Sequence, residues 1–292
     1  MAQATLMYGI GATKAGTSWL YRYLDAHPDC AMSDPKELHF FDTLETGRSK
    51  SQVAAIEERI AKVEEKRARF QGAYGDKLDA KIAALTEWRD VLASGEDDTE
   101  RYLGYLYRDA ADAKLVGDIT PAYAMLPEAR LRQMATLAPV TRFVYLLRDP
   151  VARLWSNIRM VAKRQAKAAG DVAGIAARMV QKVLAGEEKN AMARSDYAGA
   201  LSRLDRAVPA ASLFVGFYET LFSDASIEKL CRFLGIAPRP GDYGDRVHGG
   251  VPVTLEDEAR GALSRLLAPQ YAAMEARFGT LPDAWQQNMM KV

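Results

Sequence analysis

The sequence predicts an α/β protein built on one doubly wound parallel sheet with helices on both faces. Two observations carry this prediction. Short apolar runs of strand length alternate along the chain with longer segments of helical periodicity. The runs contain few polar residues, as expected for strands that are covered on both faces. Strands that alternate with helices in this way are typical of parallel sheets connected by helical crossovers.

The first elements are expected near the N-terminus. An apolar run from Ala4 to Ala12, glycine-rich at its end, predicts a buried strand. A helix is expected from Thr17 or Ser18 to about Ala26, and Pro28 ends it. Residues 30–32 predict a short second strand.

A long charged segment from Ser49 to Ser94 follows. Its first part carries apolar residues with the spacing of one helical stripe: Val53, Ile56, Ile60 and Val63. We expect a pair of helices laid on the core, and a role as a lid or a partner-binding surface is the alternative. No internal repeat or low-complexity linker interrupts the chain.

Three further strands are predicted in the second half. They are residues 115–119, 142–147 and 212–218, and the second is the clearest because it is apolar and uninterrupted. A helix is expected to begin near Val151, with a proline at its entrance. The tail after Leu255 has helical periodicity.

Composition excludes several classes of protein. The formal net charge of the 292 residues is +1, which argues against a nucleic-acid partner and requires any anion site to be local. No apolar run approaches about 18 residues and no signal peptide is evident, so we expect a cytoplasmic protein without a membrane partner. Cys30 and Cys231 have no metal-binding spacing and are expected to be free thiols.

The first strand leads into a loop, GATKAGTS, that suits an anion. Gly11 and Gly16 have the spacing of the phosphate-binding pattern G-x-x-x-x-G-K-[ST], but Thr17 follows Gly16 and the lysine is Lys14, inside the loop. Backbone N–H groups at such a helix start attract a phosphate ester, and Thr17 and Ser18 add hydroxyl donors. The alternative is an ordinary strand–turn–helix with a capped helix.

A second anion site is predicted where the clearest strand ends, in YLLRDPVARLWSNI. A kinase or NTPase usually holds Mg²⁺ with an aspartate there, but Arg148 occupies the strand end. An arginine can bind a phosphate with two parallel hydrogen bonds, and Ser156 follows eight residues later. The alternative is that Arg148 pairs with Asp149 or Asp118.

Four segments, taken together and in order, resemble a known family. They are TKAGTSWL, CAMSDPKELHFFD, GDITPAY and YLLRDPVARLWSNI. They are similar to motifs of sulfotransferases that use 3′-phosphoadenosine 5′-phosphosulfate (PAPS), in the heparan-sulfate-type and bacterial branch. The resemblance extends from Gly9 to a loop near Arg246.

The resemblance implies a fold and a reaction. The fold would be P-loop-kinase-like, with residues 1–292 as a single sulfotransferase domain and a helical insertion at about 49–94. The enzyme would move a sulfuryl group from PAPS to a hydroxyl or amine of a small-molecule or carbohydrate acceptor. The product would be 3′-phosphoadenosine 5′-phosphate (PAP), and no metal is expected.

The resemblance also implies roles for individual residues. Lys14 would stabilise the leaving group and Glu37 would be the base, with His39 as a rival base or an orienting partner. We expect apolar surroundings to raise the pKa of Glu37. The residues expected to bind PAPS are Ala15, Gly16, Thr17, Ser18, Trp19, Arg148, Ser156, Tyr197 and Arg246. Tyr197 has a core position as its alternative role.

One position departs from the family pattern. Ile119 stands before T-P-A-Y, where relatives often carry lysine. This departure and the low net charge argue against a highly sulfated glycan acceptor. Asp118 is expected either to face the acceptor or to pair with Arg148. Two other functions stay open as alternatives, a nucleotide kinase or NTPase and a non-catalytic nucleotide-binding protein.

Overall fold

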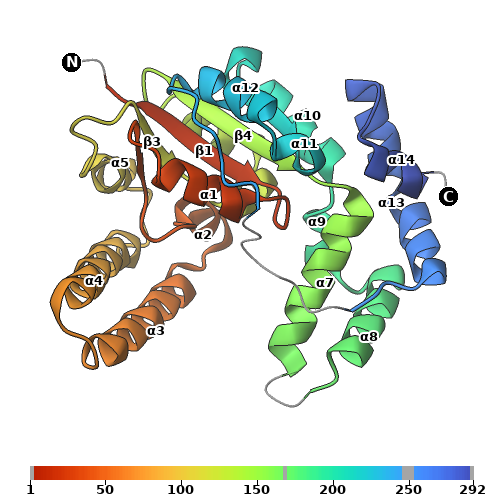
Figure 1. The fold of residues 1–292 in the computed structure, drawn as a ribbon, viewed down its shortest axis with the longest axis horizontal. Coiled ribbons are helices and arrows are strands. Elements are labelled where there is room, and N and C mark those ends of the chain that lie inside the picture. The colour runs from red at the N-terminus through yellow and green to blue at the C-terminus, as the bar shows by residue number, and fades with distance from the viewer. Residues whose placement is uncertain (1–2, 167–169, 245–252, 290–292) are drawn as a thin grey trace.

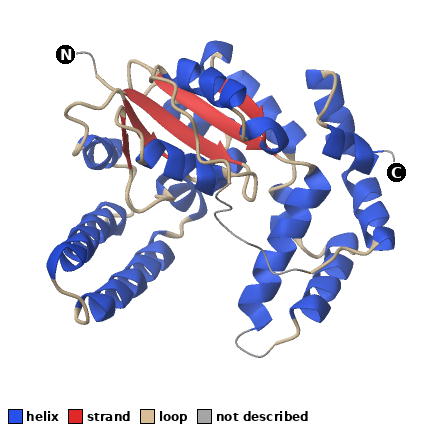
Figure 2. Ribbon diagram, viewed as in Figure 1, coloured by secondary structure: helices blue, strands red, loops and turns tan. Residues whose placement is uncertain are grey.

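The fold is a five-stranded parallel sheet with helices around it (Figures 1 and 2). The structure is a computed structural model that describes residues 3–166, 170–244 and 253–289. The strands are β1 (Thr5–Gly11), β2 (Cys30–Met32), β3 (Leu115–Asp118), β4 (Thr141–Leu147) and β5 (Leu213–Phe217). Each expected strand is present, within one residue of its predicted ends.

The helices account for most of the remaining described residues. In the first half they are α1 (Thr17–Asp25), α2 (Phe40–Thr46), α3 (Ser49–Arg67), α4 (Gly72–Ala93), α5 (Thr99–Tyr107), the 3₁₀ turn η1 (Pro121–Met125) and α6 (Glu128–Met134). The rest are α7 (Pro150–Ala166), α8 (Val172–Leu184), α9 (Lys189–Ala193), α10 (Tyr197–Ala207), η3 (Ala210–Ser212), α11 (Tyr218–Leu221), α12 (Asp224–Leu234), α13 (Asp257–Phe278) and α14 (Asp283–Met289).

The strand order places β1 at the centre of the sheet. The order is β2-β3-β1-β4-β5, and every neighbouring pair is parallel. The side chains of β1, β3 and β4 are almost all buried, whereas those of the edge strands β2 and β5 are half-buried. From β1 the chain first builds toward β2 and β3, then crosses to β4 and β5. The doubly wound fold is confirmed, and its switch point lies between β1 and β4, where such folds bind ligands.

Helices α3 and α4 are the two helices expected between Ser49 and Ser94. They form a hairpin that extends away from the sheet (Figure 1). Ile56 and Ile60 of the predicted stripe are buried against the core. On α4, the fully buried Trp88 donates its indole N–H to the Leu38 carbonyl at 3.1 Å. The hairpin is therefore attached to the loop that carries Glu37 and His39. No helix of the described residues combines the length and apolar composition needed to cross a bilayer.

We predict that Gly9→Ala destabilises the sheet. A Cβ at Gly9 would lie 2.7 Å from Cγ1 of the fully buried Ile119, so the packed core would have to shift. Overpacking of this kind lowers the free energy of unfolding by about 1–3 kcal/mol, measurable by urea denaturation. Gly104→Ala is the matched control, because a Cβ at that exposed helical position meets nothing within 4 Å. Equal stability of the two variants would contradict the packing argument.

Candidate active site

The loop after β1 forms an open helix start. Lys14 and Gly16 both have left-handed backbone, with φ of 73° and 89°. Gly16 is the N-cap of α1, no side chain caps the helix, and its first turn holds no acidic residue. Within the described residues, no side chain therefore occupies the backbone N–H groups of the first turn of α1, and these groups suit a bound anion. Thr17 and Ala15 are buried beneath the loop, whereas Ser18 is half-exposed.

Arg148 joins the two predicted anion sites. Its Nη1 donates to the Lys14 carbonyl at 3.1 Å, and its guanidinium lies 4.4 Å from the ring centre of Tyr218. The expected alternative, a pair with Asp149 or Asp118, is wrong because both carboxylates bind other groups. Arg148 therefore stands at the end of β4 directly beside the loop that follows β1.

Asp149 is buried, and its carboxylate oxygens are bound by other groups of the protein. Its carboxylate accepts hydrogen bonds from the Tyr271 hydroxyl at 2.7 Å, the Ala152 amide at 2.7 Å and the Asn288 amide at 2.9 Å. Burial raises the pKa of Asp149 to about 6, although these three donors oppose the shift. A carboxylate with its oxygens already bound in this way is poorly placed to hold Mg²⁺. Among the described residues, no cluster of three or more His, Cys, Asp or Glu side chains could hold a metal.

Ser156 lies on the face of α7 that meets the loop. Ala152, one turn before it, lines a groove together with Arg148. Met160, one turn after it, lies with its sulfur 3.8 Å from the Lys14 ammonium. Residues four apart share one side of a helix, so Ser156 stands between these two contacts. The groove has a volume of about 730 Å³ and is also lined by Tyr218, Glu219 and Arg260.

The loop between β2 and α2 carries the predicted acid–base residues. Glu37 and His39 both have left-handed backbone, with φ of 64° and 55°. The Glu37 carboxylate lies 2.5 Å from the Lys36 ammonium and 3.6 Å from His39 Nε2. His39 Nδ1 lies 2.9 Å from Asp42 Oδ2. A chain of alternating charge therefore runs from Lys36 through Glu37 and His39 to Asp42.

The expected rise in the pKa of Glu37 is wrong. Burial does raise it, but the nearby His39 and the charge of Lys36 outweigh burial and lower the pKa of Glu37 to about 2. For His39, burial lowers the pKa, but the hydrogen bond with Asp42 and the nearby Glu37 carboxylate prevail and raise it to about 9. At neutral pH the Glu37 carboxylate is therefore ionised and the His39 imidazole is protonated.

Asp42 is a member of the site that the sequence reasoning missed. It lies three residues after His39, in the first turn of α2, so both side chains share one face of the chain. The three-residue spacing between His39 and Asp42 could have indicated this pair from the sequence. The Asp42 carboxylate fixes the orientation of the imidazole ring, and the other ring nitrogen then faces Glu37.

Asp118 neither faces the acceptor nor pairs with Arg148. It is fully buried, and its carboxylate accepts hydrogen bonds from Tyr102 at 2.9 Å, Tyr123 at 2.8 Å and Thr120 at 2.7 Å. Two of these hydroxyls in turn accept hydrogen bonds from backbone amides of the loop between β2 and α2 and of the start of α2. Tyr123 binds the Phe40 amide at 3.1 Å, and Thr120 binds the His39 amide at 3.4 Å. Asp118 therefore supports the loop from inside the core.

Lys14 connects the two halves of the site. Burial lowers the pKa of Lys14, and the charges of Arg148, Arg159 and Arg164 lower it further. The charge of Glu37 acts in the opposite direction and raises it. The carboxylate of Glu37 is therefore near enough to Lys14 to stabilise its charged form.

Two aromatic residues expected to bind PAPS are covered by protein. Tyr197 is fully buried, and its hydroxyl donates to the Arg148 carbonyl at 2.8 Å, so it holds Arg148 from beneath. Trp19 is stacked between Tyr23 and Tyr243, and its indole N–H donates to the Asp242 carbonyl at 2.8 Å. Arg246 lies outside the described residues.

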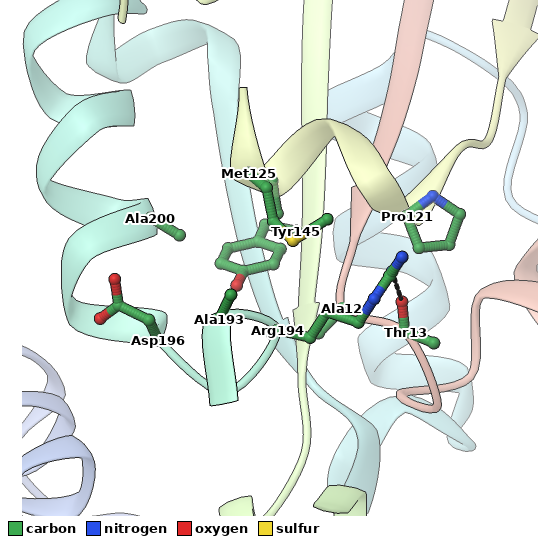
Figure 3. A pocket seen from close by; sticks show the side chains of 10 residues that line it. Ala12, Thr13, Pro121, Met125, Tyr145, Ala193, Arg194, Asp196 and Ala200 are labelled. Carbon is green, nitrogen blue, oxygen red and sulfur yellow. Dashed lines mark hydrogen bonds between the residues drawn. The ribbon is translucent and has the colours of Figure 1, made fainter. Parts of the chain in front are cut away.

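Arg194 also reaches the site, and no sequence motif had indicated it. It lies between α9 and α10, and its Nη1 donates to the Thr13 hydroxyl at 2.8 Å (Figure 3). Thr13 directly precedes Lys14. The contact joins segments 181 residues apart, so only the folded chain brings them together.

The comparisons with known proteins agree with this arrangement. The model of a sulfotransferase family matches residues 8–240. The chain belongs to this family. A search of the curated proteins finds no significant match.

Two solved structures share the fold of this sulfotransferase. A sulfotransferase from Alicyclobacillus acidocaldarius has a TM-score of 0.64 at 20% identity, covering 98% of this chain and 100% of that one. The sulfotransferase domain of the Synechococcus PCC 7002 olefin synthase has a TM-score of 0.51 at 19% identity, covering 96% and 95%. These matches show the fold of the sulfotransferase superfamily, which the sequence motifs had indicated.

We predict that Asp42→Asn lowers the pKa of His39 from about 9 toward its ordinary value of 6.5. Because the folded state raises this pKa, the stabilisation by the Asp42–His39 pair is complete below pH 6.5 and is lost as the pH rises through about 9. The stability difference between wild type and variant should shrink over that window. Titration of the imidazole by NMR, with urea unfolding at several pH values, measures both effects. An unchanged His39 pKa would contradict the assignment.

Proposed function

We propose that the enzyme transfers a sulfuryl group from PAPS to a hydroxyl or amine of a small-molecule or carbohydrate acceptor. The observation that carries this proposal is the Arg148–Lys14 contact, which unites two anion-binding segments at one switch point. PAPS has two anionic groups, the 5′-phosphosulfate and the 3′-phosphate, and a separate segment can bind each. A cytoplasmic location stays a prediction.

The residues present fit the donor on physical grounds. The uncapped start of α1 offers backbone amides to the 5′-phosphosulfate, and Thr17 and Ser18 add hydroxyl groups. Arg148 and Ser156 are the residues for the 3′-phosphate. The groove of about 730 Å³ beside Arg148 is within the size range of sites for small molecules and cofactors. Trp19, Tyr197 and Arg246 keep a proposed role near the nucleotide, with Tyr197 acting through Arg148.

The chemistry follows from the charges around Lys14 and Glu37. The acceptor oxygen or nitrogen forms a bond to sulfur while the bond from sulfur to the 5′-phosphate oxygen breaks. Lys14 stabilises the negative charge that develops on that phosphate oxygen. Glu37 accepts the acceptor's proton, because its carboxylate is ionised at neutral pH. Its low pKa weakens it as a base, since a general base is most effective with a pKa near the working pH. His39, protonated at neutral pH, orients Glu37 in this scheme, which disfavours it as the base.

The alternative of a nucleotide kinase or NTPase finds less support. It would need a carboxylate free to hold Mg²⁺ at the end of β4. The Asp149 oxygens are already bound by Tyr271, Asn288 and a backbone amide. A non-catalytic nucleotide-binding protein would need neither the Glu37–His39–Asp42 chain nor the support that Asp118 gives to it.

We predict that PAP raises the melting temperature and that ATP with Mg²⁺ does so much less. A ligand that binds only the native state stabilises it by an amount set by its concentration and dissociation constant. Thermal shift with both ligands measures this. Arg148→Ala should weaken PAP binding by about tenfold or more, as expected for a lost charge-assisted contact. Stabilisation by ATP–Mg²⁺ alone would overturn the proposed function.

We predict that Lys14→Ala and Glu37→Gln each lower turnover, by roughly a hundredfold or more for a lost acid–base or electrostatic contribution. Glu37→Gln should leave PAP affinity nearly unchanged, because Glu37 faces the acceptor. A screen of hydroxyl and amine acceptors with radiolabelled PAPS provides the assay. If Glu37→Gln keeps full activity, the base lies elsewhere, and His39 is the next residue to substitute.

A further inference from the structure

Arg194 is a cation at the edge of the site with no role in the scheme above. Its guanidinium donates a hydrogen bond to the Thr13 hydroxyl, and it forms no ion pair within the described ranges. Burial lowers the pKa of Arg194, while the charges of Asp42 and Glu37 act in the opposite direction. Arg194 therefore lies within electrostatic reach of the base and of its partner, on the acceptor side of the loop.

The donor side has its own set of cations. The charges that lower the pKa of Lys14 most are those of Arg148, Arg159 and Arg164, all at the end of β4 or on α7. Arg194 comes from a different part of the chain, between α9 and α10. The two phosphate-bearing ends of the donor can be bound without it.

The turn that carries Arg194 is held in place from inside the core. Arg153, on α7, is fully buried, and its Nη2 donates to the Ala191 carbonyl at 3.1 Å and to the Ser195 hydroxyl. These two residues flank Arg194 in sequence. Because Arg153 and Arg148 share one segment, the position of Arg194 is fixed relative to the donor site. A preorganised cation of this kind binds an anion without first being ordered.

A small apolar cleft lies beside the guanidinium. The cleft has a volume of about 10 Å³, and its lining includes Pro121, Met125, Tyr145 and Ala200. Figure 3 shows Arg194 and Thr13 on one side of these residues. A cleft of this volume is about the size of one water molecule, so it does not enclose a ligand, and the half-exposed Arg194 would be reached from outside it.

The carboxylates near Arg194 already have other partners. Glu37 pairs with Lys36 and Asp42 with His39, and Asp196, which lines the same cleft as Arg194, accepts hydrogen bonds from the Gly199 amide and Gln270. Desolvating a guanidinium is unfavourable unless an anion compensates for it. A planar guanidinium matches a carboxylate with two parallel hydrogen bonds.

We propose that Arg194 binds a carboxylate of the acceptor and so selects hydroxyl or amine acceptors that carry one. This inference rests on the proposed sulfuryl transfer and adds the chemical class of the acceptor. The bound carboxylate would orient the nucleophile toward Glu37, in line with the donor.

The test compares matched compounds that differ in the carboxylate. The pairs are N-acetyltyrosine with N-acetyltyrosinamide, lactate with lactamide, and glucuronate with glucose. Their binding to the PAP-saturated enzyme is measured by calorimetry for wild type, Arg194→Gln and Arg194→Lys. Arg178→Gln, at an exposed position on α8, is the control for loss of one positive charge.

In at least one pair, wild type should bind the carboxylate about tenfold or more tightly than its neutral partner. Arg194→Gln should lose this preference while PAP affinity changes less than about twofold, and Arg194→Lys should recover part of it. Arg178→Gln should behave as wild type. The inference is overturned if no pair shows a preference, if Arg194→Gln keeps it, or if Arg194→Gln loses PAP affinity. A wild type that does not bind PAP at all would overturn the proposed function instead.

Discussion

The contact between the Arg148 guanidinium and the Lys14 carbonyl is the interaction on which the rest of the site depends. It spans the switch point between β1 and β4, where two parallel strands deliver their following loops to one edge of the sheet. The buried Tyr197 holds Arg148 from beneath, and Arg148 in turn holds the loop that presents Lys14 and the start of α1. Two segments 134 residues apart, each proposed to bind an anion, are thus held together.

The proposed acceptor side is built by a different means, a buried carboxylate. Among the described residues Asp118 forms no ion pair, and three hydroxyl groups donate hydrogen bonds to its oxygens. The hydroxyls of Thr120 and Tyr123 also accept hydrogen bonds from the backbone amides of His39 and Phe40, just after Glu37. Trp88, on the helical hairpin, donates a hydrogen bond to the Leu38 carbonyl. The left-handed backbone at Glu37 and His39 needs such support, because non-glycine residues adopt it only where surrounding structure compensates.

The sequence predicted what short-range patterns encode. Apolar runs located all five strands, and the glycines of the first loop with the arginine at the end of β4 indicated two anion sites. Partners distant in sequence could not be predicted. Arg194 meets Thr13 only in the folded chain, and the Asp149 carboxylate is bound by Tyr271 and Asn288 from helices with no motif. The direction in which the pKa of Glu37 shifts could not be predicted from sequence either, because it depends on which side chains turn toward the carboxylate in the folded chain.

The distribution of charge is consistent with the proposal that a nearly neutral chain binds a strongly anionic donor. The net charge is +1, yet Lys14, Arg148 and Arg194 converge on one edge of the sheet, with the buried Arg153 behind them. Burial and mutual repulsion lower the pKa of Lys14 and Arg153, so the unliganded site stores unfavourable electrostatic free energy. An anionic ligand relieves that repulsion as it binds. In this proposal the same cations determine both the affinity for an anionic ligand and the stability of the folded protein. The preference for anions would come from local desolvation of these cations, without a basic surface over the whole protein.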